Sequence, residues 1–272
     1  DRMARGLDAL VSMREALRNY RVEEIHVLAT SAMRDAKNGH EFVAQAKELT
    51  GFDIQVISGQ HEARLIQEGI LLNFPEPPTE TCLTMDIGGG SVEFIVWDAG
   101  GIKWAQSFDT GVARLQMLMN LPDPIGSKGV ASMRPYFDDV MAPLAAAMEA
   151  LKPTLLVGAS GSFDTIADLV GTRTRTKRPD HAQTPEPHPV TDPVPMTDWA
   201  EVARQLIECD VHHRTAMPGM DPARVDLMPF SAGLIQWVLE QGTVTRMCRA
   251  PYALREGVLS RLERALPLLP DL

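Results

Sequence analysis

Residues 85–93 (Met-Asp-Ile-Gly-Gly-Gly-Ser-Val-Glu) place three consecutive glycines between two carboxylates, with an apolar run on either side. Apolar residues before Asp86 and after Glu93 predict a β-hairpin whose turn is formed by the glycines. Glycine allows unusual backbone angles there and lets successive N–H groups converge on an anion. Asp86 and Glu93 supply the hard oxygen ligands that Mg²⁺ prefers. The stretch therefore indicates phosphoryl-transfer chemistry, with a plain tight hairpin as the structural alternative.

Three other predicted strands end in small or hydroxylated residues. These ends are Thr30-Ser31, Ser58-Gly59 and residues 158–162 (Gly-Ala-Ser-Gly-Ser). Such turns present backbone N–H groups, often at a helix N-terminus, where an anion can bind. One small-residue turn is common, whereas four in one chain, two of them rich in glycine, indicate phosphate binding.

Strand patterns alternate with helix patterns, which predicts an α/β protein. We expect helices near 2–19, 40–50, 61–73, 111–120, 130–151, 163–170, 197–214, 231–241 and 253–265, and strands near 24–29, 53–57, 102–109, 154–158 and 243–248, besides the hairpin. The Pro-rich segment 74–78 marks a boundary between a first lobe at 1–78 and a second lobe at 79–272. Residues 171–196, rich in Pro, Thr and charge, are expected to form a long mobile loop.

The composition excludes several classes of protein. Of the 272 residues, 44% are hydrophobic and 23% charged, as in ordinary soluble domains, and no apolar run is long enough to span a membrane. A net charge of −10 argues against broad nucleic-acid binding. A basic cluster at 173–178 either guides an anionic substrate or is simply a solvated loop. Three widely spaced cysteines predict free thiols in a reducing cytoplasm.

Six segments, in order over nearly the whole chain, resemble the Ppx/GppA family of exopolyphosphatases and guanosine pentaphosphate phosphohydrolases. These segments are residues 29–38, 57–64, 86–93, 111–114, 158–162 and 254–257. The resemblance implies an actin-like fold with two RNase H-like lobes around a phosphate-binding cleft, the C-terminal helix packing back on the first lobe. It also implies hydrolysis of terminal phosphoanhydride bonds with Mg²⁺ or Mn²⁺, acting on inorganic polyphosphate first and guanosine pentaphosphate second. A homodimer is compatible with it.

The resemblance assigns roles residue by residue. Glu62 matches the glutamate that activates the attacking water, Asp86 the metal-binding aspartate, and Glu93 a second acid near both metal and water. The residues expected to bind phosphate are Thr30, Ser31, Arg34, Gly88, Gly89, Gly90, Ser91, Gly158, Ser160, Gly161 and Ser162.

Each assignment has a structural alternative. Glu62 could only complement a helix dipole, and Arg34 could form a surface ion pair with Asp35. The hydroxyl groups of Thr30 and Ser31 could cap the next helix, and residues 158–162 could pack a strand closely on a helix. Arg114 is either a further phosphate contact or part of a structural salt bridge. His61, where the family often has an acid, is expected to be a partly exposed residue at a helix start.

The N-terminus departs from the family pattern. Nothing in residues 1–25 matches the family's first phosphate loop, so we expect the first lobe to be incomplete in this sequence. If the protein begins at Asp1, hydrolysis should be weak or absent. Two other classes of function stay open at this point. One is a sugar or acetate kinase of the same superfamily, and the other is a non-catalytic protein that binds polyphosphate or an alarmone.

Overall fold

A computed structural model of the chain describes residues 2–175 and 191–270, of which 172–175 are described by their backbone alone. The chain packs into two compact units, Asp1–Glu62 and Ala63–Leu272. Lobes at 1–78 and 79–272 stay a prediction, since compact packing does not by itself define a functional lobe. The α/β character predicted from the sequence is confirmed.

The first unit is built around two short parallel strands, β1 (Val27–Ala29) and β2 (Ile54–Val56). Between them the chain forms α2 (Ser31–Asp35) and α3 (Gly39–Thr50), and α1 (Arg2–Leu17) packs on α3. Because both strands run the same way, the residues that follow them, Thr30 and Ile57, lie at the same edge of the pair. This places α2 beside the start of α4 (Gly59–Leu71), which begins in the first unit.

The second unit contains a six-stranded sheet with the order β5-β4-β3-β6-β8-β7. The strands are β3 (Cys82–Ile87), β4 (Val92–Asp98), β5 (Gly101–Phe108), β6 (Leu155–Ala159), β7 (Asp192–Val194) and β8 (Arg246–Arg249). β3, β4 and β5 form an antiparallel meander, which confirms the predicted hairpin. β6 pairs in parallel with β3, and β8 in parallel with β6.

Side chains alternate between the two faces of this sheet, because successive residues of a strand point in opposite directions. One face carries Met85 and Phe94 into a large apolar core. That core is completed by α5 (Val112–Met119), α6 (Gly126–Val140), α7 (Ala142–Leu151), α8 (Ser160–Arg175), α9 (Met196–Glu208), the short α10 (Val211–Thr215) and α11 (Met228–Leu239). The other face packs Ile95 and Trp97 against α4.

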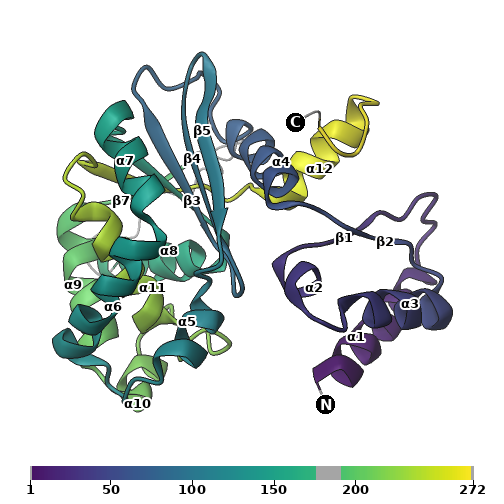
Figure 1. Cartoon of the computed structure of the whole chain (residues 1–272), viewed down its shortest axis with the longest axis horizontal. Coiled ribbons are helices and arrows are strands. Elements are labelled where there is room, and N and C mark those ends of the chain that lie inside the picture. Colours follow the sequence, from purple (N-terminus) through teal and green to yellow (C-terminus); the bar gives the residue numbers. More distant parts are fainter. Residues whose placement is uncertain (1, 176–190, 271–272) are drawn as a thin grey trace. The chain divides into compact units, whose positions relative to one another are not determined.

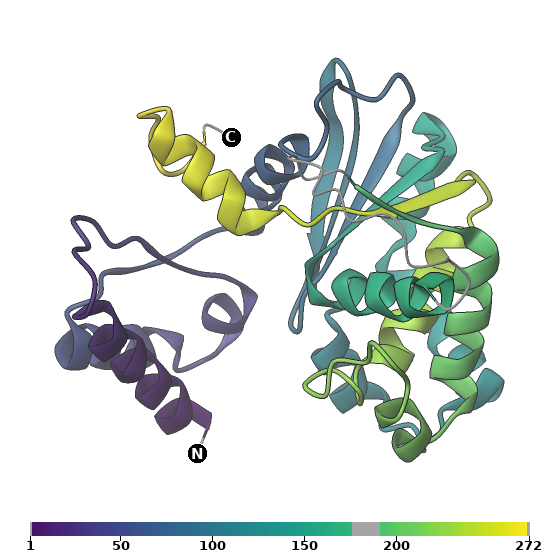
Figure 2. The ribbon, with the colours of Figure 1, turned by 180° about the vertical axis from the view of Figure 1, so that it is seen from behind.

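α4 and α12 (Leu254–Glu263) lie side by side, as both views show (Figures 1 and 2). Two glycines allow the close approach. A Cβ atom on Gly69 would lie 1.8 Å from the carbonyl oxygen of Ala253, and one on Gly257 would lie 1.9 Å from that of Leu65. The buried side chain of Asn73 joins the same two segments through hydrogen bonds to the backbone N–H and C=O groups of Tyr252.

Several predicted elements differ from those observed. The helix expected at 130–151 is broken at Met141, because Pro143 starts the separate helix α7. The helix expected at 197–214 is broken at Cys209 and Asp210, where the Asp210 side chain caps α10. The loop expected at 171–196 is too long at both ends, since α8 continues to Arg175 and β7 begins at Asp192. Its middle, with Lys177 and Arg178 of the basic cluster, lies outside the described residues.

Within the described ranges, none of the helices has the length and apolar character needed to cross a membrane. All three cysteines are free thiols, as predicted, and Cys82 and Cys248 are buried.

Candidate active site

The two carboxylates of the hairpin lie opposite each other. Asp86 on β3 pairs with Glu93 on β4, so both side chains stand on the face of the sheet that α4 covers, about 5 Å apart at their Cβ atoms. Ser107 on β5 continues the row and donates a hydrogen bond of 2.7 Å to Glu93. Both carboxylates are buried, at 6% and 2% exposure. Burial of two acids on one face is costly unless hydrogen bonds or opposite charges compensate it.

Asp86 is held by the start of α8. Burial raises the pKa of the Asp86 carboxyl to about 6; a hydrogen bond from the Ser160 hydroxyl lowers it, and the charge of Asp164 raises it. Ser160 has φ of +66°, in the left-handed region that non-glycine residues rarely adopt. Such strain is typical of functional sites, and here it accompanies the contact between a hydroxyl group and a buried carboxylate.

The glycine turn is held from one side by the first turn of α5. The N–H groups of Val112 and Ala113 donate to the carbonyl oxygens of Gly88 and Gly89, at 3.0 Å each. Gly111 donates to Gly90, and its own Cα approaches so closely that a Cβ would lie 2.4 Å from the turn's carbonyl carbons. The orphan N–H groups of this helix are therefore used by the turn rather than by an anion.

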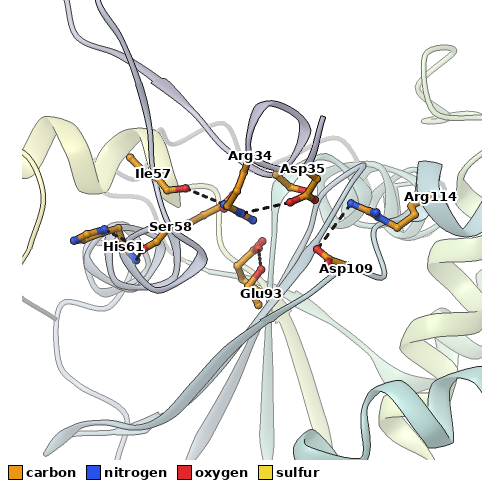
Figure 3. Close-up of polar contacts among 11 residues, drawn as sticks. Arg34, Asp35, Ile57, Ser58, His61, Glu93, Asp109 and Arg114 are labelled. Carbon is orange, nitrogen blue, oxygen red and sulfur yellow. Dashed lines mark hydrogen bonds and ion pairs between the residues drawn. The ribbon is translucent and has the colours of Figure 1, made fainter. Parts of the chain in front are cut away.

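Arg114 also contacts the turn. Its Nε donates to the carbonyl oxygen of Gly90 at 3.0 Å, and one Nη lies 3.8 Å from a carboxylate oxygen of Asp109 (Figure 3). These contacts favour the structural alternative for Arg114 given above over a phosphate contact.

Residues 158–162 have several structural uses. The ring of Phe163 occupies the space where a Cβ of Gly158 would be, at 1.9 Å. The Ser162 hydroxyl is buried and lies 3.0 Å from that of Ser231, so it faces the core. The guanidinium group of Arg224 covers Gly161 and is tethered to Asp221 at 3.2 Å. These contacts favour packing for Gly158 and Ser162, and phosphate binding by this segment stays a prediction.

In the first unit, Arg34 reaches from α2 to the start of α4. Its Nη1 donates to the carbonyl oxygen of Ile57 at 2.9 Å (Figure 3). The same Nη1 lies 3.2 Å from a carboxylate oxygen of Glu62. The pair expected with Asp35 is longer, at 3.8 Å. Glu62 is only 6% exposed, so Arg34 neutralises a nearly buried charge and fixes its orientation.

The hydroxyl groups before α2 differ in their contacts. Ser31 is buried and donates to Asp35 at 2.9 Å. Thr30 stands at the N-cap of α2 without a side-chain capping bond in the described structure. The Thr30 hydroxyl therefore does not cap α2, which is the role that the structural alternative gave it. His61 is half-buried and contacts the Ser58 hydroxyl at 3.0 Å, as expected of a residue at a helix start.

The sequence alone did not point to Ser107 or Arg224 as residues of the site. Ser107 could have been found from strand register, because it follows from pairing the strand near 102–109 with Glu93. Arg224 lies 63 residues from Gly161, so no local pattern joins the two. Among the described residues, no cluster of three or more His, Cys, Asp or Glu side chains forms a complete protein cage for a metal ion.

Comparison with known proteins gives consistent results. The Ppx/GppA phosphatase family matches residues 1–265. A Haemophilus influenzae protein named "Putative exopolyphosphatase" is 27% identical over 266 residues, which are 96% of this chain and 76% of that protein. The crystal structure of an exopolyphosphatase from Cytophaga hutchinsonii has a TM-score of 0.88 and 32% identity, over 98% of this chain and 84% of that one. The Aquifex aeolicus Ppx/GppA family member has the same fold, with a TM-score of 0.73 and 21% identity over 97% of this chain and 82% of that one.

Proposed function

Because the chain belongs to the Ppx/GppA phosphatase family and is therefore a phosphoanhydride hydrolase, we propose that it releases orthophosphate from the ends of inorganic polyphosphate. The observation that carries the proposal is the buried pair Asp86 and Glu93, set on one sheet face at either end of a glycine turn. The Cytophaga hutchinsonii relative, named as an exopolyphosphatase, supports polyphosphate over other phosphoanhydrides.

We propose that Asp86 and Glu93 hold Mg²⁺ or Mn²⁺. Mg²⁺ is usually bound by one or two carboxylates, with water and substrate oxygens completing the shell. Two buried carboxylates that share one face match this donor set. It does not require a cluster of three metal-ligating side chains, and none is found among the described residues. When bound, the cation would neutralise the charge of phosphoryl oxygens.

We propose Glu62 as the general base. A carboxylate that is ionised and fixed can accept a proton from a water molecule attacking the terminal phosphorus. Arg34 places a positive charge and a hydrogen-bond donor beside the Glu62 carboxyl group, and the bond from Arg34 to Ile57 fixes the guanidinium group itself. In this proposal Arg34 orients Glu62. The phosphate contact predicted for Arg34 from the sequence would then be made by its other N–H donors.

The glycine turn would bind phosphoryl oxygens through its backbone N–H groups. Among the described residues, the N–H groups of Gly89, Gly90 and Ser91 have no hydrogen-bond acceptor, and Gly89 is exposed. Successive free N–H groups form a concave site suited to an anion.

The test is release of orthophosphate from the full protein, with Mg²⁺ and either polyphosphate or guanosine pentaphosphate. We expect release from polyphosphate to be faster at equal concentrations of terminal phosphate. Glu62→Gln should reduce kcat by about a hundredfold to ten-thousandfold while leaving substrate binding largely intact, since it keeps the shape and removes the base. Glu48→Gln, the same change on an exposed position of α3, is the matched control and should have wild-type activity.

The other outcomes separate the alternatives. Faster release from guanosine pentaphosphate than from polyphosphate would show that guanosine pentaphosphate is the preferred substrate. Tight binding of either compound without release would establish a binding protein. Full turnover by Glu62→Gln would remove Glu62 from the role of base.

A further inference from the structure

The peptide units of the glycine turn all face the same way. The carbonyl oxygens of Gly88, Gly89 and Gly90 accept hydrogen bonds from the backbone of residues 111–114. In a trans peptide unit the C=O of one residue points opposite to the N–H of the next. The N–H groups of Gly89, Gly90 and Ser91 therefore point away from α5.

Arg114 lies on the carbonyl side of the turn. Its backbone N–H donates to Gly89 at 3.1 Å, and its Nε donates to Gly90 at 3.0 Å. The second bond fixes the peptide unit between Gly90 and Ser91, whose N–H is the last of the three. Asp109, 3.8 Å from one Nη, holds the far end of the guanidinium group.

Gly111 completes this support through its lack of a side chain. Its φ of −58° and ψ of 149° are open to any residue, so its backbone conformation does not require glycine. The lack of space requires glycine here, because a Cβ would lie within 2.4 to 2.5 Å of atoms of Gly89 and Gly90. An alanine at this position must push the turn away from α5.

We propose that residues 111–114 form a brace that orients the three turn N–H groups towards the substrate, and that Arg114 is a positioning residue of this brace rather than a phosphate ligand. The inference rests on the proposed use of the turn as a phosphate site. It gives the hydrogen bond from Arg114 Nε to the Gly90 carbonyl oxygen a catalytic consequence, through the backbone that this bond holds.

Kinetics of Arg114→Gln test the role. Without the Nε bond the turn loses its fixed orientation, so kcat should fall by about tenfold to a hundredfold, the kinetic equivalent of one charge-assisted hydrogen bond, with KM changed by less than about threefold. The slope of log KM against log salt concentration should not change. Arg204→Gln is the matched control, because Arg204 is exposed and its Nε also donates to an acceptor, Glu201, three residues away.

A direct phosphate ligand would behave differently. Whatever its effect on kcat, its removal would raise KM by at least about tenfold and reduce the salt slope by about one, as for the loss of one phosphate contact. That result would overturn the proposal.

A second measurement does not depend on turnover. In protein labelled with ¹⁵N-glycine and ¹⁵N-serine, inorganic phosphate should shift the amide resonances of Gly89, Gly90 and Ser91 in the wild type. Arg114→Gln should displace the Gly90 and Ser91 resonances before phosphate is added and weaken their response to it. Unchanged resonances, as in Arg204→Gln, would refute the brace.

Gly111→Ala keeps the test valid if Arg114→Gln does not fold. It should produce the same displaced resonances, whereas Gly171→Ala, where a Cβ has open space, should not. If the wild-type protein binds phosphate at these amides but releases none from polyphosphate, the proposed function is wrong. The brace is then tested by the amide resonances of the variants alone.

Discussion

Replacing Gly257 with alanine should lower the melting temperature, whereas the same replacement at Gly171 should raise it or leave it unchanged. Both glycines lie inside helices, α12 and α8, without a positive φ. They differ in their surroundings. A Cβ on Gly257 would lie 1.9 Å from the Leu65 carbonyl oxygen, whereas one on Gly171 meets no atom of the described residues outside its own stretch of helix within 4 Å.

The size of the effect follows from the contact. Non-bonded Cβ contacts below 3.0 Å are essentially never found, so α12 must move away from α4 by roughly 1 Å. Overpacking of this kind costs about 1–3 kcal/mol, and alanine returns up to about 1 kcal/mol through its higher helix propensity. These two effects leave a net cost of up to about 3 kcal/mol for Gly257→Ala. At about 2–4 °C per kcal/mol for a chain of this size, Gly257→Ala should melt up to about 12 °C lower and Gly171→Ala up to about 4 °C higher.

Differential scanning calorimetry of both variants measures this difference. Gly69→Ala should resemble Gly257→Ala, because it meets the carbonyl oxygen of Ala253 at 1.8 Å. The double variant should lose less than the two single variants together, since one separation of the helices relieves both overlaps. A Gly257→Ala protein as stable as Gly171→Ala would refute this account of the contact, and strict additivity would refute the shared movement.

Two further predictions concern the interior of the second unit. Asn73→Ala should lower the free energy of unfolding by about 2–4 kcal/mol in urea titrations, because it leaves the N–H and C=O of Tyr252 without their partner; a loss below about 0.5 kcal/mol would show that water replaces the side chain. Iodoacetamide at about pH 8 should modify only Cys209 in the folded protein, since Cys82 and Cys248 are buried and burial raises the pKa of their thiols to about 12 and about 11. Intact mass after labelling checks this, with all three thiols modified in denaturant as the control, and a second fast-reacting thiol in the folded state would contradict it.

The sequence predicted the parts of the site that depend on local pattern. Apolar runs around three glycines predicted the hairpin, and their spacing brought Asp86 and Glu93 to opposite positions. It could not predict contacts made by the folding of distant segments. Arg34 meets Glu62 because β1 and β2 pair in parallel, and strands of three residues give little signal.

Other differences have identifiable causes. The Ser162 hydroxyl faces Ser231 in the core, a direction that spacing alone cannot give, and phosphate binding by Ser162 stays a prediction. The break at Met141 could have been predicted, because Pro143 fits the first turn of a helix and not its interior. β7 contains a proline and lies at the sheet edge, where that residue is tolerated and the strand pattern is weak.

The pairing of Asp86 with Glu93 also has a consequence for how the chain reaches its native state. A slip of one residue along β3 or β4 would turn a carboxylate into the apolar core that contains Met85 and Phe94, because neighbouring residues face opposite sides. An unpaired charge in such a core is strongly unfavourable. The two acids that we assign to metal binding therefore also disfavour misaligned hairpins during folding, so variants that neutralise them should be examined for strand register as well as for turnover.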